Sequence, residues 1–216
     1  MMEAGKKKSD APHSNSSPMS EKERKVLISD NYKKMQTSLH ETGVYGGASL
    51  FFAPMVAQVI ERMGVQHLLD YGCGSHCNLA KSMKVPHKIK YQAYDPCVER
   101  FAAPPVPAEM VACIDVLEHI EPEYLDSVLD HLASLTEAVA FISIGTGAAL
   151  KTLEDGRNAH LTQQDMRWWL PKLWDRFDLQ TVQYIDENSF FVIAVAKSQL
   201  EGGDGKKLPV VGLKLS

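Results

Sequence analysis

Three acidic residues, each at the end of an apolar run, are the positions of this sequence best suited to chemistry. Residues 68–74 read Leu-Leu-Asp-Tyr-Gly-Cys-Gly, so an apolar stretch ends in an acidic, glycine-rich turn. Asp95 ends a second run, and Asp115 ends a third that continues into Glu118 and His119. An apolar strand followed by a glycine-rich loop and a helix brings backbone N–H groups close to a nucleotide-like ligand. The pattern therefore indicates a binding site for such a ligand.

These segments resemble the motifs of the class I S-adenosylmethionine-dependent methyltransferases, over residues 45–197. The resemblance implies S-adenosylmethionine as cofactor, with the glycine loop facing its methionine part and the second acid binding its ribose hydroxyls. The residues it assigns to the cofactor are Asp70, Gly72, Cys73, Gly74, Asp95, Pro96, Asp115 and Val116. The alternative role for Asp70 is to cap the loop that follows its strand. In this motif we favour the cofactor role.

Two features depart from the pattern of that family. His76 stands where the glycine loop usually has a third small residue, so its side chain either displaces the cofactor or itself faces the site. The connection 101–107 is short and rich in proline, whereas the family usually places another strand and an adenine-binding residue there. The sequence therefore identifies no contact for the adenine.

The acceptor end of the site is expected near residues 151–161, a polar stretch that follows a buried strand and overhangs the same edge of the sheet. Methyl transfer needs the acceptor held in line, and oxygen or ammonium acceptors also need a base. His160 and His119 are the candidate bases, with local capping and packing as their alternative roles. The candidates for contacting a small polar acceptor are Glu118, Arg157, Asn158, Trp168 and Tyr45.

The alternation of apolar runs and amphipathic segments predicts an α/β fold. We expect a Rossmann-like three-layer sandwich with a mostly parallel sheet of seven strands, or six, and a C-terminal antiparallel hairpin. Helices are expected over 48–63, 78–83 and 122–135, and after a capping box formed by Thr162 and Asp165. The predicted divisions are a disordered polar tail (1–20), a helical arm (21–44), the methyltransferase domain (45–197) and a flexible tail (198–216).

Composition bounds the class of protein. Hydrophobic residues make up 44% and charged residues 23% of the chain, which is typical of a soluble globular protein. The net charge of −4 provides no general field for a polyanion, so a small-molecule substrate is favoured over nucleic acid. No apolar run is long enough to span a membrane, and four cysteines favour reduced thiols in the cytoplasm over a disulfide framework. The oligomeric state is not determined.

Two other functions and a metal site are alternatives to this interpretation. A non-catalytic binding or scaffold protein with a degenerate methyltransferase fold is favoured by two observations, His76 in the glycine loop and the absent adenine-binding segment. The acids Asp70, Asp95 and Asp115 oppose it. A dinucleotide-dependent oxidoreductase is less favoured, because residues 72–77 lack the third glycine of Gly-x-Gly-x-x-Gly. We expect no metal at Cys73, His76 and Cys77, because no second pair of ligands has zinc-type spacing.

Overall fold

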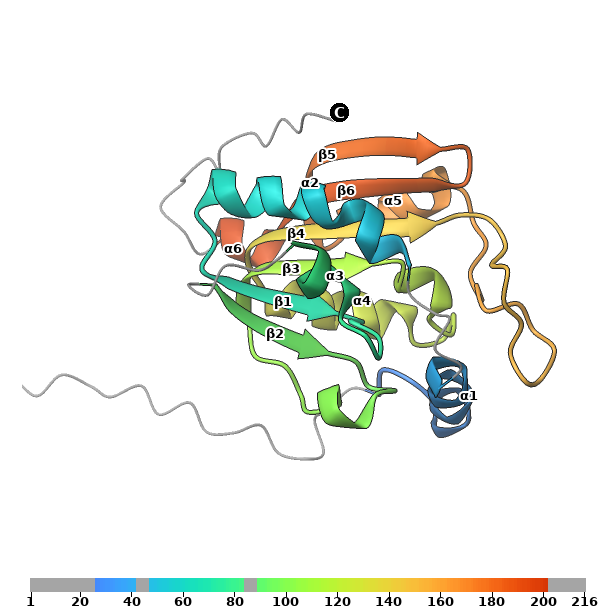
Figure 1. Cartoon of the computed structure of the whole chain (residues 1–216). Coiled ribbons are helices and arrows are strands. Elements are labelled where there is room, and N and C mark those ends of the chain that lie inside the picture. The colour runs from blue at the N-terminus through green and yellow to red at the C-terminus, as the bar shows by residue number, and fades with distance from the viewer. Residues whose placement is uncertain (1–25, 42–46, 84–88, 202–216) are drawn as a thin grey trace, which may run out of the picture.

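The computed structural model describes residues 26–41, 47–83 and 89–201, which fold around one sheet (Figure 1). Within these residues the sheet has six strands in the order β2-β1-β3-β4-β6-β5. The strands are β1 (His67–Tyr71), β2 (Lys90–Tyr94), β3 (Ala108–Ile114), β4 (Thr136–Gly145), β5 (Phe177–Asp186) and β6 (Ser189–Ala196). The first four are parallel, and β6 is antiparallel to β4 and β5. The predicted mostly parallel sheet with its terminal hairpin is therefore confirmed.

Two layers of helices cover the sheet, as the sandwich prediction requires (Figure 1). Their bounds are α2 (Ala48–Met63), α3 (Asn78–Met83), α4 (Leu125–Leu135) and α5 (Met166–Trp174). Successive strand residues face opposite layers. Leu68 packs with Phe52 of α2, whereas Leu69 packs in the cluster that holds Leu129 of α4 and Trp169 of α5. Each face of the sheet is thus buried by an apolar helix surface.

The sheet ends at β2, because no strand forms between β2 and β3. That connection contains the short helix η2 (Glu99–Phe101) and then an extended segment with Pro104, Pro105 and Pro107. Proline has no N–H to donate to a strand ladder, so this segment cannot add a seventh strand. The six-stranded alternative is the one the structure shows.

The start of α5 differs from the predicted capping box. The carboxylate of Asp165 accepts a hydrogen bond from Trp168 N at 3.0 Å, so Asp165 is the N-cap and the helix begins at Met166. Thr162 lies in the preceding loop, where its backbone N–H donates to Glu118 O at 3.0 Å. The Thr-x-x-Asp spacing is that of a capping box, but here the second residue of the pair caps the helix.

The termini of the chain are described only in part. Within the predicted arm, α1 (Asp30–Glu41) is helical, while the predicted tail 1–20 lies outside the described residues. Helix α6 (Lys197–Glu201) reaches into the first residues of the predicted tail 198–216, and the remainder of that tail lies outside the described residues. No helix in the described segments is both long and apolar enough to cross a membrane. The four cysteines all lie in described segments and form no disulfide.

Candidate active site

The predicted site residues gather at the carboxyl ends of the parallel strands, where two cavities adjoin. The narrow cavity has a volume of about 90 Å³ and the wide cavity about 340 Å³. Both are lined by His40, Gly72, Asp115 and His119, so these four residues lie between them. Open α/β sheets bind ligands at this edge, beyond the strand ends.

The glycine loop after β1 is held against β2 by its own backbone. The N–H groups of Gly72 and Cys73 donate to Tyr94 O at 2.8 and 3.1 Å. Gly72 has φ +81°, and a Cβ at this position would lie 2.4 Å from a methyl group of Val116. A residue with a side chain is therefore excluded here by both conformation and space. The loop backbone forms part of the wall of each cavity.

Asp95 joins the glycine loop to the loop after β2. Its carboxylate accepts hydrogen bonds from Gly74 N at 3.0 Å and Cys97 N at 2.9 Å, and His40 Nε2 lies 3.7 Å from it. An ionised carboxylate has about four acceptor sites, so capacity remains for two hydroxyl groups. Asp95 lines the narrow cavity, whose apolar walls include Pro96 and Val116. A carboxylate beside apolar side chains is a combination that could bind the ribose hydroxyls and the adenine of a nucleoside.

Asp70 lies beneath the glycine loop and lines neither cavity. The hydroxyl of Tyr91 on β2 donates to its carboxylate at 2.5 Å, and the residue is only 2% exposed. Burial raises the pKa of the Asp70 carboxyl to about 7, although the hydrogen bond from Tyr91 opposes this shift. Its position favours a structural role under the loop over direct contact with a cofactor.

Asp115 lines both cavities at the end of β3. Its φ of +51° places it in the left-handed region, which aspartate tolerates better than most residues. Ser143 on β4 holds it there: the Ser143 hydroxyl donates to Asp115 Oδ1 at 2.8 Å, and the backbone N–H of Asp115 donates to Ser143 Oγ at 3.1 Å. Burial raises the pKa of the Asp115 carboxyl.

Glu118, His119 and His160 form one cluster beside Asp115, although His119 and His160 are far apart in the sequence. Glu118 and His119 lie on the short helix η3 (Leu117–His119), and His160 comes from the loop after β4. One ligand atom of each residue lies within 4.8 Å of the others, and the two imidazole centroids are 4.7 Å apart. These three residues could hold a metal ion.

Burial governs the protonation of this cluster. It lowers the pKa of His119 to about 3, with a further contribution from the neighbouring His160, so the His119 ring is neutral near pH 7. It also raises the pKa of the Glu118 carboxyl, as does the nearby Asp115. A histidine with so low a pKa accepts protons weakly. The structure therefore favours a binding role for His119 over the predicted role as base.

Gly145, the last residue of β4, allows Glu118 and His160 to approach each other. A Cβ at this position would lie 2.9 Å from His160 Cε1 and 3.0 Å from Glu118 Oε1. Gly145→Ala should therefore destabilise the protein by roughly 1–3 kcal/mol, the usual cost of overpacking, measured as urea-induced unfolding. Gly47→Ala is the matched control, because a Cβ at Gly47 meets nothing within 4 Å. Equal stability of the two variants would contradict the packing described for Gly145.

Helix α1 forms a wall of the narrow cavity that sequence reasoning did not place. Tyr32, Gln36 and His40 line this cavity, and the Tyr32 hydroxyl donates to His119 O. The start of the helix is anchored by Ser29, whose N–H and hydroxyl donate to the Glu121 carboxylate at 2.8 and 2.7 Å. The amphipathic spacing of this segment predicted a helix, but no local signal indicates where the helix packs.

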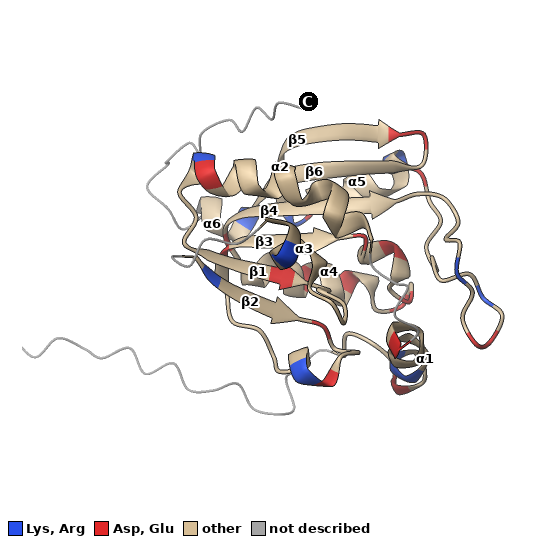
Figure 2. Ribbon diagram, in the orientation of Figure 1, with Lys and Arg blue, Asp and Glu red and all other residues tan. Residues whose placement is uncertain are grey.

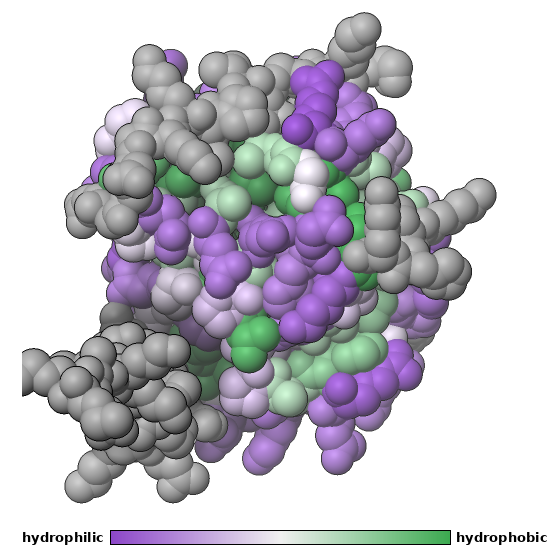
Figure 3. All heavy atoms as spheres, turned by 90° about the vertical axis from the view of Figure 1, so that its left-hand side faces the viewer, coloured by the Kyte–Doolittle hydropathy of each residue, from purple (hydrophilic) through white to green (hydrophobic). Residues whose placement is uncertain are grey.

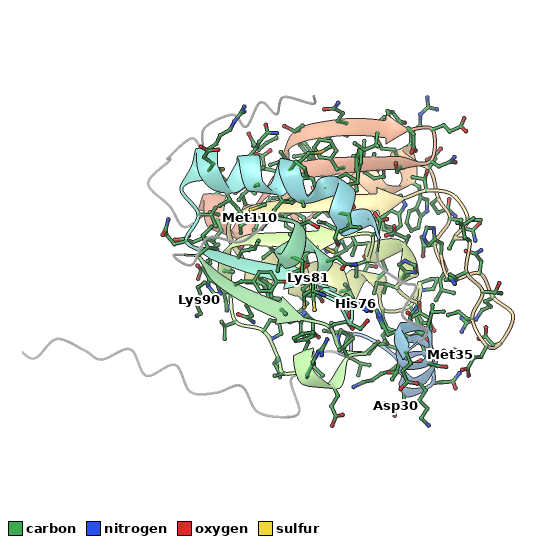
Figure 4. All side chains as sticks on the ribbon, viewed as in Figure 1. Asp30, Met35, His76, Lys81, Lys90 and Met110 are labelled. Carbon is green, nitrogen blue, oxygen red and sulfur yellow. The ribbon has the colours of Figure 1, made fainter. Side chains whose placement is uncertain are left out.

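The same helix packs on the loop that carries His160. Tyr32 and Met35 of α1 form a small apolar cluster with Leu153 and Ala159 of that loop. Figure 4 labels Asp30 and Met35 on α1, beyond the ends of the central strands. The helix therefore supports both the narrow cavity and the position of the His160 loop.

The residues predicted to contact the acceptor are only partly brought together. Glu118 is in the cluster, whereas the exposed Arg157 pairs with Asp155 at 2.7 Å and lines neither cavity. Asn158 stabilises its own loop, since its amide donates to Ala149 O and accepts from Ala149 N. Trp168 lies under the Lys172 ammonium group on α5, and it also lines neither cavity. Tyr45 lies outside the described residues.

His76 does not fill the glycine loop. It is exposed, lies beyond β1 at the edge of the wide cavity, and bonds through Nδ1 to the Ser75 hydroxyl at 2.8 Å (Figure 4). The loop therefore accommodates a larger residue by turning its side chain toward solvent. This placement removes one of the two observations that favoured a degenerate pocket.

The rest of the surface offers no comparable cluster among the described residues. A third cavity, of about 340 Å³, lies at the ends of α2 and α3 and has Glu61 as its one charged lining residue. Lysine and arginine are dispersed over separate elements (Figure 2). The face at the left of Figure 1 is largely hydrophilic, with smaller hydrophobic areas (Figure 3). The carboxyl edge is therefore the best candidate for an active site.

Comparison with known proteins defines the fold. No family model and no curated protein matches the sequence. The structure resembles 1,6-didemethyltoxoflavin-N1-methyltransferase of Burkholderia thailandensis, solved with S-adenosylhomocysteine (14% identity, 81% of this chain and 92% of that one, TM-score 0.57). It also resembles the DhpI–SAH complex (12% identity, 78% of this chain and 98% of that one, TM-score 0.51). A third similar structure is TnmH (16% identity, 68% of this chain and 55% of that one, TM-score 0.50). The chain thus spans about half the length of TnmH. Its fold is that of the class I S-adenosylmethionine-dependent methyltransferases.

Proposed function

We propose that this protein is an S-adenosylmethionine-dependent methyltransferase that methylates an oxygen or nitrogen atom of a small polar acceptor. The observation that carries the proposal is the pair of adjoining cavities at the carboxyl edge, which share Gly72, Asp115 and His119. The narrow cavity has the acid and the apolar walls for an adenosine group. The wide cavity extends from the glycine loop to His160, with room for the methionine part and an acceptor.

In this arrangement the chain acts mainly by positioning. Asp95 binds the ribose hydroxyls, Pro96 and Val116 pack on the adenine, and Gly72 and Gly74 lie against the methionine part. When bound, the cofactor supplies an electrophilic methyl group on sulfur, and the acceptor must lie in line with the C–S bond. The cluster of Glu118, His119 and His160 holds the acceptor at the end of the wide cavity where His160 lies. Arg157 and Trp168 line neither cavity and have no role in this arrangement, while Asp70 supports the glycine loop from below.

The first test is calorimetric titration of the purified protein with S-adenosylmethionine, S-adenosylhomocysteine and, separately, NADH. We expect micromolar binding of both sulfur compounds and none of NADH. Binding of NADH alone would support the dinucleotide-dependent oxidoreductase instead. No binding of any of the three would support the non-catalytic protein.

His160 provides a test of the acceptor end. His160→Ala should lower transfer of a labelled methyl group to small hydroxyl or amino compounds at least 100-fold, within the range for loss of an acceptor-activating group. The affinity for S-adenosylmethionine should change much less than the turnover, because His160 does not line the narrow cavity that we assign to the adenosine group. His67→Ala, at the opposite end of β1, is the control for the loss of an imidazole. Full turnover in His160→Ala would remove His160 from the reaction.

A further inference from the structure

The cluster of Glu118, His119 and His160 has the composition of a metal centre. Two imidazole nitrogens and one carboxylate oxygen lie within 4.8 Å of one another in the described part of the chain. Ligand atoms around one ion at about 2.1 Å lie roughly 3–3.5 Å apart, so small side-chain rotations would bring these three onto an ion. Two histidines and one carboxylate suit zinc and other first-row divalent ions.

The backbone holds both imidazole rings in the tautomer that binds metals. His119 Nδ1 lies 2.8 Å from Ala159 O, and His160 Nδ1 lies 2.7 Å from Gly147 O. A carbonyl oxygen can only accept, so each Nδ1 carries the proton and each Nε2 carries the lone pair. Histidine ligands of metals usually donate their other N–H to a carbonyl or carboxylate in this way.

Glu118 supplies the independent sign that a ligand is needed. Its Oε1 accepts a hydrogen bond from Gly145 N at 2.6 Å, and the residue is fully buried. Its Oε2 is also buried and has no hydrogen-bond partner among the described residues. An unpaired carboxylate oxygen in a protein interior is costly, and coordination to a cation is one of the ways to satisfy it.

We infer that Glu118, His119 and His160 bind a divalent metal ion, and that this ion holds a hydroxyl oxygen of the methyl acceptor. Three protein ligands leave a position open for another ligand, as in catalytic zinc sites. His119 and His160 line the wide cavity, so that position is reached from the space proposed for the acceptor. This inference rests on the proposed function and specifies it as methylation of oxygen.

Coordination accounts for activation of the acceptor without a separate base. A hydroxyl group bound to a divalent cation loses its proton to water more readily. The oxygen then forms a bond to the methyl carbon while the C–S bond breaks. The electron pair of that bond stays on sulfur and gives S-adenosylhomocysteine. His160 acts here as a ligand, which is consistent with the expected loss of turnover in His160→Ala.

The experiment measures metal binding without activity. The full chain, stripped with EDTA and dialysed, is titrated calorimetrically with zinc chloride and, separately, manganese chloride. We expect one site per chain for at least one of the two ions. Glu118→Gln and His160→Ala should each weaken it at least 100-fold while keeping the wild-type melting profile. His76→Ala is the matched control, because this exposed imidazole belongs to the alternative thiol site with Cys73 and Cys77.

The outcomes separate this inference from the proposed function. Binding lost in Glu118→Gln and His160→Ala but kept in His76→Ala supports the metal centre. Absence of binding in the wild type, or binding that survives in both cluster variants, overturns it. Titration of the same samples with S-adenosylmethionine tests the methyl donor separately. If the protein binds S-adenosylmethionine but no metal ion, only the metal centre is contradicted. If it binds a metal ion but no S-adenosylmethionine, the proposed function is contradicted.

Discussion

Asp95→Ala is expected to weaken the binding of S-adenosylmethionine at least 100-fold. The substitution removes a charged acceptor that we assign to two ribose hydroxyls, and each such hydrogen bond contributes about 1.5–3 kcal/mol. It also releases the N–H groups of Gly74 and Cys97, which the carboxylate now holds in place. Both losses weaken the site that we assign to the cofactor, so they act in the same direction. Calorimetric titration of the variant measures the effect.

Two further variants locate the cause of this loss. Asp95→Asn keeps one oxygen that accepts from a backbone N–H, so it should bind the cofactor better than Asp95→Ala but less well than the wild type. Asp175→Asn changes an exposed residue after α5 and should leave the affinity unchanged. Wild-type affinity in a well-folded Asp95→Ala variant would show that the bound cofactor does not contact this carboxylate.

Asp70→Asn is expected to stabilise the protein at high pH. Burial raises the pKa of this carboxyl to about 7 from 3.8, so between these values the folded chain holds a proton that the unfolded chain has lost. The contribution of Asp70 to stability is therefore greatest at low pH and falls as the pH rises toward 7. Asparagine stays neutral and can still accept from the Tyr91 hydroxyl. The variant should gain up to about 4 kcal/mol relative to the wild type by pH 8.

Urea-induced unfolding of both proteins at pH 5.5 and pH 8.5 measures this effect. The difference in unfolding free energy between variant and wild type isolates Asp70, because both chains share every other titrating group. The gain at pH 5.5 should be roughly half of the gain at pH 8.5, because pH 5.5 lies midway between the two pKa values. The exposed Asp175→Asn should show no such trend. A difference that does not depend on pH would mean that Asp70 is ionised throughout this range.

Local patterns were sufficient to locate most elements of the fold. The apolar face of residues 48–63 and the glycine that follows it predicted α2, whose end is capped by Gly64 with φ +66°. The short link between residues 185 and 189 predicted the antiparallel hairpin of β5 and β6, because only neighbouring antiparallel strands can be joined so closely. The start of α5 was placed wrongly, since Thr162 and Asp165 are both good caps and tertiary packing selects between them.

The position of the site was also predictable, and the reason is topological. Parallel strands place their carboxyl ends at one edge, so acids that end β2 and β3 must lie near the glycine loop after β1. Asp95 and Asp115 both line the narrow cavity at this edge. Asp70 ends an apolar run in the same way, yet it points under the loop toward Tyr91. A one-residue change along a strand reverses the face of the sheet, and the sequence alone did not show which face Asp70 occupies.

The chemistry of the acceptor end depends on contacts between residues far apart in the chain. The residue types of Glu118, His119 and His160 were visible as candidates, but a cluster exists only because the loop after β4 folds back over η3. Thr162 N bonds to Glu118 O, and Gly145 leaves space for both side chains. The helices, the strands and the loops between them follow from local hydrophobic pattern and turn chemistry. The packing of two loops and α1 around the two cavities is a property of the tertiary structure.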